Sequence, residues 1–141
     1  MEEMNNRSCQ SIMVIEDDED IRSVLVDLLA EEGYETHSAE NGKEALETLR
    51  QIPKPCLVFL DLMMPIMNGR EFLDEVMKDS YLAPVPVVVV SAIADKADVS
   101  GAVGYLKKPI DMDRILAVAR KFCEDKSLVR KMPPEAQSHP V

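Results

Sequence analysis

The chain has 141 residues, of which 46% are hydrophobic and 30% charged, and a formal net charge of −10. This length suits one domain with its own core, and the composition excludes a disordered chain. No apolar stretch is long enough to predict a membrane-spanning helix. Without a Lys/Arg-rich run, the acidic balance disfavours nucleic acid or an anionic membrane as a partner and favours a cation or a basic protein surface.

Two further features concern the cellular compartment. Residues 1–7 lack the basic flank and apolar block of a signal peptide, so we expect a cytoplasmic protein. The three cysteines, Cys9, Cys56 and Cys123, are odd in number, widely spaced and without a CxxC motif. We therefore expect reduced, structural thiols rather than a redox or zinc site.

Short apolar runs alternate with helical patterns along the chain. Residues 11–15 predict a first strand, because they are apolar, partly β-branched and stop abruptly at an acidic stretch. Apolar residues between 21 and 29 then recur at helical spacing up to Gly33, which predicts a helix. The same criteria predict strands at 34–38, 56–60, 87–90 and 102–106, and helices after Asn41-Gly42, after Asn68-Gly69, over 94–100 and from Asp111 as N-cap.

This alternation predicts an α/β fold with a parallel sheet covered by helices on both faces. We expect a flavodoxin-like, doubly wound sheet of five strands in the order 2-1-3-4-5, with a short fourth helix. The domain is expected to span residues 10–123, after an N-terminal extension at 1–9. Residues 124–141 are polar and proline-bearing, so we interpret them as a flexible tail, with a short docking extension as the alternative.

Acidic residues follow the first and third predicted strands. If these strands are neighbours, Glu16, Asp17 and Asp61 crowd together at the carboxyl edge of the sheet, where ligands bind in such folds. Their mutual repulsion calls for a cation, and Mg²⁺ prefers such oxygen ligands. The acids at 18–20 are instead interpreted as a solvated loop that caps the first helix.

The fourth and fifth strands add a hydroxyl and an ammonium group. Ser91 ends the fourth strand, and Lys108 follows the fifth. Alone, Ser91 would be a turn residue and Lys108 a surface cation. Facing a carboxylate that binds a metal, the two groups together form a site suited to a phosphoryl group.

These motifs resemble the receiver domain of two-component response regulators, over about residues 10–123. Each motif alone is weak, but all four occur in order at predicted strand ends. They are Val14-Ile15-Glu16-Asp17-Asp18, Leu60-Asp61-Leu62-Met63-Met64-Pro65 with Asn68-Gly69, Ser91-Ala92, and Lys108-Pro109.

The resemblance implies a phosphoacceptor chemistry for the acidic edge. Asp61 would take a phosphoryl group from a phosphohistidine on a sensor histidine kinase or phosphotransfer protein. Asp17 would bind Mg²⁺ directly and Glu16 mostly through water, while the backbone carbonyl of Met63 would complete the protein ligands together with Asp61.

The resemblance also assigns roles to the last two strand ends. Lys108 would pair with Asp61 before transfer and with the phosphoryl group afterwards, and the Lys108–Pro109 peptide would be cis. Ser91 and Tyr105 would form a switch pair, in which the hydroxyl moves toward the phosphoryl group and the ring rotates into the vacated space. Packing of the ring on the core is the alternative for Tyr105.

One departure from the family pattern concerns the output. Only the residues Ala92 to Gly104 separate Ser91 from Tyr105, so the helix at 94–100 has room for one or two turns, which puts the usual output face in doubt. No effector domain follows, so we expect a stand-alone receiver that reaches an unknown target protein by contact or onward phosphotransfer. The apolar Met63 and Ile93 would restrict water access to the phosphoryl group.

Three classes of function are therefore weighed. The first is a phosphoacceptor response regulator, which is not a conventional enzyme beyond its own phosphorylation and slow dephosphorylation. The second is a receiver-like interaction module that is independent of phosphorylation, although such modules often lose a site residue and none is lost here. The third, a metal-dependent phosphohydrolase, typically has a second Asp two positions after its nucleophile, where this chain has Met63.

Overall fold

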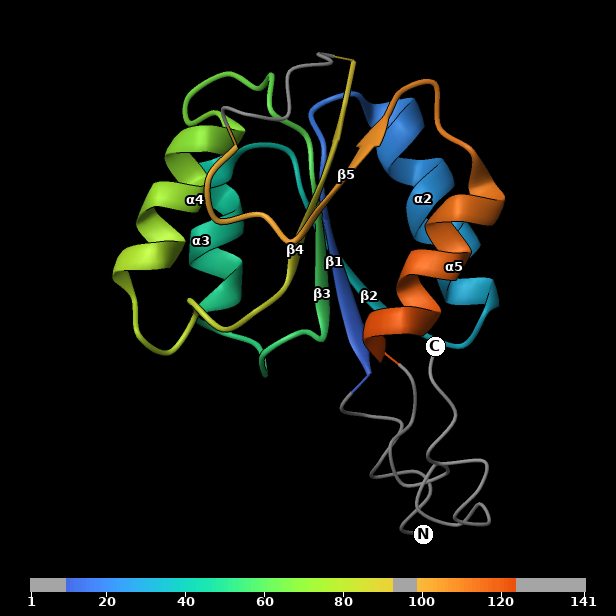
Figure 1. The fold of residues 1–141 in the computed structure, drawn as a ribbon, viewed down its shortest axis with the longest axis horizontal. Helices are drawn as coiled ribbons and strands as arrows, with labels where there is room; N and C mark the ends of the chain where they lie inside the picture. The colour runs from blue at the N-terminus through green and yellow to red at the C-terminus, as the bar shows by residue number, and fades with distance from the viewer. Residues whose placement is uncertain (1–9, 93–98, 124–141) are drawn as a thin grey trace, which may run out of the picture.

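The computed structural model describes residues 10–92 and 99–123 (Figure 1). Its strands are β1 (Ser11–Ile15), β2 (Glu35–Ala39), β3 (Leu57–Leu60), β4 (Val87–Ser91) and β5 (Gly104–Lys107). Its helices are α2 (Glu19–Glu31), α3 (Gly42–Leu49), α4 (Gly69–Lys78) and α5 (Met112–Cys123). The expected helix over 94–100 and the position of Ile93 fall mainly or wholly outside the described residues, as do the N-terminal extension and the tail.

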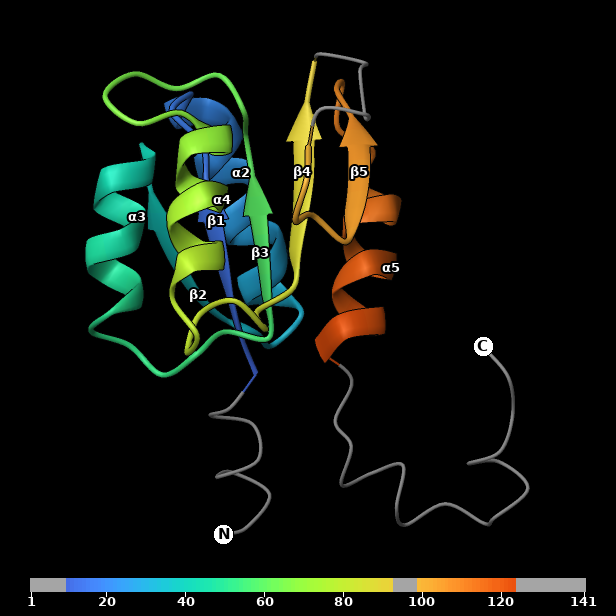
Figure 2. The same cartoon turned by 60° about the vertical axis from the view of Figure 1, so that its left-hand side comes forward.

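The strands form one parallel sheet in the order β2-β1-β3-β4-β5. The predicted fold and strand order are therefore confirmed. The arrows of β3, β4 and β5 point the same way, so their carboxyl ends meet at one edge (Figure 2). The second and third strands begin one residue later than predicted and the fifth begins two residues later, which is within the usual uncertainty of element ends.

Two helical layers bury the sheet, with α2 and α5 on one face and α3 and α4 on the other (Figure 1). β1 serves both layers, because alternate side chains of a strand point to opposite faces. Ile12 and Val14 join the core beneath α2 and α5, whereas Met13 and Ile15 join the core beneath α3 and α4. None of the helices in the described part of the chain is both long and apolar enough to cross a membrane.

Side chains cap the helices near the carboxyl edge of the sheet. Asn68 accepts from the backbone N–H of Glu71, and Glu71 accepts from that of Asn68, which forms a capping box at the start of α4. Asp111 Oδ1 accepts from the backbone N–H of Asp113 at 3.0 Å, as expected for the N-cap of α5. These caps fix where each helix begins beside the strand ends.

The expectation of reduced cysteines is wrong for two of the three. Cys56, just before β3, and Cys123, the last residue of α5, form a disulfide with their Cα atoms 5.5 Å apart. Sequence spacing gave no hint of this pair, because the two residues are 67 positions apart and only the packing of α5 brings them together.

Candidate functional site

Two strands bring acidic residues to one point. The backbone N–H of Asp61 donates to the Ile15 carbonyl at 2.9 Å, which holds the end of β3 against the end of β1. Glu16 and Asp61 are only 2% and 5% exposed, whereas Asp17 is exposed. One carboxylate oxygen from each of these three acids lies within 4.8 Å of the others. The predicted acidic cluster is therefore present.

Lys108 is the cation at this cluster. Its backbone N–H donates to the Ser91 carbonyl at 2.9 Å, so β4 positions the residue that follows β5. Its Nζ lies 2.9 Å from Glu16 Oε1 and 3.7 Å from Asp61 Oδ1, so Glu16 is the nearer partner. The Lys108–Pro109 peptide is cis, as the resemblance implied.

Burial and repulsion shift the pKa values of both partners. Burial, together with the charge of Glu16, raises the pKa of Asp61 to about 7, and Lys108 only partly offsets this. Burial alone would lower the pKa of Lys108, but its hydrogen bond to Glu16 and the neighbouring negative charges outweigh burial and raise it. Three carboxylates face one ammonium group, so the donor set fits a hard divalent cation such as Mg²⁺.

Met63 lies at the rim of the cluster. Its backbone N–H points to Asp61 Oδ1 at 3.4 Å, and its side chain is 62% exposed. The predicted use of its carbonyl as a metal ligand stays a prediction.

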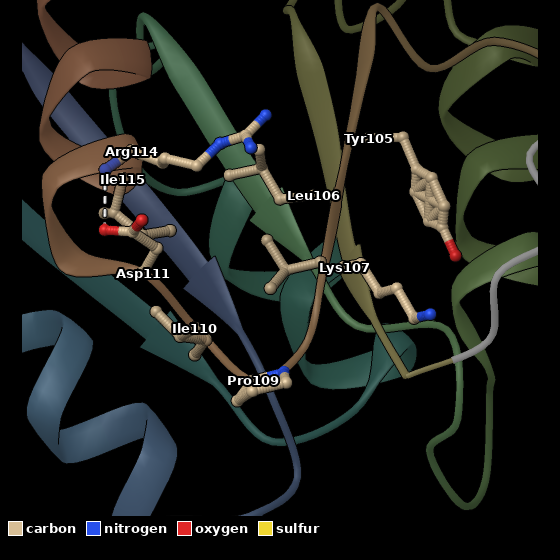
Figure 3. Close-up of a pocket in the computed structure, with 9 residues that line it drawn as sticks. Tyr105, Leu106, Lys107, Pro109, Ile110, Asp111, Arg114 and Ile115 are labelled. Carbon is tan, nitrogen blue, oxygen red and sulfur yellow. Dashed lines mark hydrogen bonds between the residues drawn. The ribbon is translucent and has the colours of Figure 1, made fainter.

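Ser91 and Tyr105 lie on neighbouring strands. Ser91 is fully buried at the end of β4, and Tyr105 is half-buried on β5. The Tyr105 hydroxyl is buried without a hydrogen-bond partner among the described residues. Figure 3 shows Tyr105 and Lys107 projecting from one side of β5 and Leu106 from the other. The switch role of the pair stays a prediction.

A hollow of about 340 Å³ runs along β5 and the start of α5 (Figure 3). Tyr105 and Leu106 line it together with two cationic side chains, Lys107 and Arg114. Neither cation forms an ion pair within residues 10–92 and 99–123. Asp111 also lines this β5–α5 hollow, which thus combines apolar side chains with two cations and one acid.

Sequence reasoning missed Arg22, which positions the cluster, and did not explain Gly69. Arg22 on α2 donates from Nη1 to the Glu16 carbonyl at 2.7 Å. The only sign of this contact in the sequence is that Arg22 lies in the first turn of the helix that follows Glu16. Gly69 begins α4 so close to β3 that a Cβ atom there would lie 2.5 Å from the Asp61 carbonyl oxygen and 2.8 Å from Leu62 Cα. The family motif pointed to this glycine without giving its steric reason.

Known proteins resemble this chain over nearly all of the described fold. The family profile of the response regulator receiver domain matches residues 12–120. The polar-differentiation response regulator DivK of Brucella anthropi is 32% identical over 121 residues, which cover 82% of this chain and 98% of that protein. The transcriptional regulatory protein CrdR of Helicobacter pylori is 35% identical over 121 residues, covering 82% of this chain and 56% of that protein.

Solved structures give the same result. The response regulator TrrA of Thermotoga maritima, in complex with Mg²⁺-BeF, matches with a TM-score of 0.72 and 32% identity over 80% of this chain and 98% of that chain. The chemotaxis protein CheY4 of Vibrio cholerae matches with a TM-score of 0.74 over 80% of this chain and 98% of that chain, and at 24% identity it supports the fold. The chain therefore belongs to the response regulator receiver domain family.

Proposed function

We propose that this protein is a phosphoacceptor response regulator, which takes a phosphoryl group onto Asp61 from a phosphohistidine on a sensor histidine kinase or phosphotransfer protein. The observation that carries the proposal is the buried Asp61 carboxylate, which lies at the end of β3 beside Glu16 and 3.7 Å from Lys108. A buried acid with a cation and two further acids beside it is suited to accept a phosphoryl group.

The chemistry follows from the groups around Asp61. A carboxylate oxygen of Asp61 attacks phosphorus, the P–N bond to the imidazole breaks, and its electron pair stays on the imidazole nitrogen. Lys108 is near enough to Asp61 to contact a phosphoryl oxygen after transfer. Glu16, Asp17 and Asp61, with the Met63 carbonyl, would hold Mg²⁺. When bound, this ion would offset the repulsion between carboxylate and phosphoryl group.

Phosphorylation would change the positions of the Ser91 and Tyr105 side chains, and this change would alter the β5–α5 hollow, where a target protein would bind. The Tyr105 hydroxyl is buried and has no hydrogen-bond partner among residues 10–92 and 99–123, which favours a side chain that changes position, because a buried hydroxyl without a partner is costly. Lys107 and Arg114 outnumber the one acid in the hollow, Asp111, which favours a target protein that presents acidic residues there. Phosphorylation would then shift the population of the binding-competent state.

The direct test is phosphorylation by acetyl phosphate. With Mg²⁺, intact mass should show one added phosphoryl group on the wild type and on Asp74→Asn, an exposed acid on α4. Asp61→Asn and wild type in EDTA should show none. Equal labelling of wild type and Asp61→Asn would contradict the assignment. A target whose affinity is unchanged by beryllofluoride would favour the phosphorylation-independent module instead.

The phosphodonor would dock on an apolar hollow beside Lys108. Its walls include Ile21 and Val24 on α2 and Met112 on α5, and the last two are 43% and 47% exposed. A protein donor must cover this surface to bring its phosphohistidine to Asp61, whereas a small donor need not. Val24→Asp should therefore slow transfer from a phosphorylated donor protein at least about tenfold, from a loss of 1.4 kcal/mol or more.

The same variant should leave acetyl phosphate labelling unchanged. Met77→Asp is the matched control, because Met77 is 50% exposed on α4, on the opposite face of the sheet. Equal transfer rates for Val24→Asp and Met77→Asp would rule out this docking surface while leaving the role of Asp61 intact.

A further inference from the structure

We propose that Cys56 and Cys123 form a thiol–disulfide exchange site. It would react with small thiols and disulfides of the glutathione class, and it would reversibly fasten the last turn of α5 to the start of β3. This site is separate from the proposed phosphorylation of Asp61, which lies at the other end of β3.

The two cysteines join the ends of two elements that are not neighbours in sequence. Cys56 directly precedes β3 and Cys123 ends α5, and the two residues are 67 positions apart. Their Cα separation of 5.5 Å is within the range that a disulfide spans without backbone movement. The last turn of α5 lies at the end of the sheet where the strands begin (Figure 1). Reduction or oxidation therefore acts far from Lys108 and Asp61.

The fold also provides for the reduced state of Cys56. Its Sγ lies 3.2 Å from the Ser11 carbonyl oxygen, a contact with hydrogen-bond geometry for a thiol donor. A disulfide sulfur has no proton to donate, so this hydrogen bond forms only after reduction. The Ser11 carbonyl also accepts the backbone N–H of Cys56 at 2.8 Å, a hydrogen bond that does not depend on the state of the sulfur and holds the backbone of Cys56 in place.

The reduced state of Cys123 is accommodated by apolar packing. Cys123 is 3% exposed and belongs to the core cluster beneath α2 and α5, with Leu57 and Ala119. A free thiol behaves as a small hydrophobic side chain in such surroundings. Both the bonded and the reduced pair thus fit the same fold, as a reversible site requires.

The exchange balances with two molecules of a small thiol. Cys56 is partly buried and Cys123 fully buried, so the first thiolate attacks the Cys56 sulfur. The S–S bond breaks, its electron pair leaves on Cys123, and that sulfur takes a proton. A second thiolate attacks the small molecule's sulfur in the mixed disulfide and releases Cys56 as a thiol. Two small thiols are oxidised to one disulfide, and the protein disulfide is reduced to two thiols.

Reduction would loosen the end of α5. The other contacts near this end include the buried Ala119, the partly buried Phe122 on the same core cluster, and an exposed ion pair in which Arg120 Nη2 lies 3.7 Å from Glu32 Oε1. Exposed ion pairs contribute little to stability, so the last turn is held mainly by Ala119, Phe122 and the disulfide. The redox state would then decide how firmly the chain is held where it leaves α5. In a reducing compartment, bonds of this kind are typically transient or regulatory.

Trapping experiments test the chemistry on the full chain. After equilibration in oxidised glutathione, N-ethylmaleimide added with denaturant should leave Cys56 and Cys123 unlabelled, and after equilibration in reduced glutathione it should label both, as mapped by peptide mass. Cys9→Ser should give the same pattern, which excludes pairing with the third cysteine. Labelling of Cys56 and Cys123 in both buffers, or in neither, would overturn the proposal.

Thermal melting and hydrogen exchange test the consequence. Reduction should lower the melting temperature of the wild type by about 10 °C and speed exchange in the last turn of α5. The double variant Cys56→Ser/Cys123→Ala should have a melting temperature close to that of the reduced wild type in both buffers. If the double variant does not fold, the single variant Cys123→Ala makes the same test. Asp61→Asn should show the full redox shift. Equal exchange of α5 in the two buffers would overturn the proposed fastening.

Discussion

The two ends of the sheet differ in the chemistry of their side chains. At the carboxyl end, Glu16, Asp61 and Ser91 are buried polar residues, and one ammonium group faces the acids. At the amino end, Cys56 and Cys123 join β3 to α5 covalently. Buried like charges destabilise a fold, whereas a long-range disulfide stabilises it.

This difference shows how one small domain accommodates a reactive site. The raised pKa of Asp61 means that its ionised form is disfavoured in the folded protein. Such a site would bind a cation favourably, because the free site carries an excess of negative charge. We infer that the carboxyl end is kept unstable for function, while the rest of the sheet supplies the stability. The following predictions test this contrast, from the largest expected effect to the smallest.

Removing the ammonium group of Lys108 from the acidic end should have the largest effect. Lys108→Met removes the ammonium group that pairs with the buried carboxylates of Glu16 and Asp61, so the free energy of unfolding in EDTA should fall by about 3 kcal/mol. Urea denaturation measures this change. Lys107→Met, at the exposed neighbouring position, should stay within about 0.5 kcal/mol of wild type. Similar losses for both variants would mean that the acids do not depend on Lys108.

Adding a Cβ atom at the start of α4, where the helix packs tightly on β3, should have the second largest effect. In Gly69→Ala, the new methyl group meets the backbone of Asp61 and Leu62 at 2.5 and 2.8 Å, so α4 or β3 must shift. We expect a loss of about 2 kcal/mol in the free energy of unfolding and slower labelling by acetyl phosphate.

Gly104→Ala is the matched control for this steric effect. Its Cβ would lie 3.4 Å from Val88 Cγ2, which is ordinary contact, so its stability should remain close to that of wild type. If both alanine variants are equally stable, close packing of α4 on β3 does not require glycine at position 69.

The sequence predicted the carboxyl end of the sheet far better than the amino end. Its strands end in polar residues after apolar runs, as at Ile15-Glu16 and Leu60-Asp61, and a parallel sheet gathers such ends at one edge. The disulfide carried no comparable pattern. Only the packing of α5 on the sheet brings Cys123 to Cys56, and that packing is a property of the whole fold.

The distances and hydrogen bonds within the acidic cluster could not be predicted from the sequence either. The motif placed Lys108 among the acids, but side-chain geometry decides that Glu16, at 2.9 Å, is nearer to it than Asp61, at 3.7 Å. Similarly, the hydrogen bond from Arg22 to the Glu16 carbonyl depends on how α2 leaves the sheet. Local patterns predict which residues meet, whereas distances within the cluster depend on tertiary packing.

Neutralising the central acid should stabilise the protein, in contrast to the loss of Lys108. At pH 8 in EDTA, Asp61→Asn removes a buried charge that burial and Glu16 disfavour, so the free energy of unfolding should rise by about 1–2 kcal/mol. The exposed Asp74→Asn should change it by less than about 0.5 kcal/mol. Added Mg²⁺ should stabilise wild type more than Asp61→Asn, as measured by urea denaturation, because the variant lacks one ligand charge. A destabilised Asp61→Asn in EDTA would refute the contrast between the two ends.

The smallest expected effect comes from backbone strain in the loop that follows Asp61. Ile66 has a φ of 70° and is 77% exposed, and the N–H of Met67 donates to the Pro65 carbonyl at 2.7 Å across it. This is a tight three-residue turn in a conformation that a β-branched residue adopts at a cost.

Replacing Ile66 by glycine should relieve this strain with little loss of packing. Glycine also gains entropy in the unfolded chain, so the net rise in the free energy of unfolding should be only about 0.5–1 kcal/mol. Ile66→Ala keeps a Cβ atom and should gain less, which separates strain from the loss of an exposed apolar side chain. If urea denaturation gives both variants the same stability, positive φ at Ile66 carries no measurable strain, and the instability of the carboxyl end is electrostatic alone.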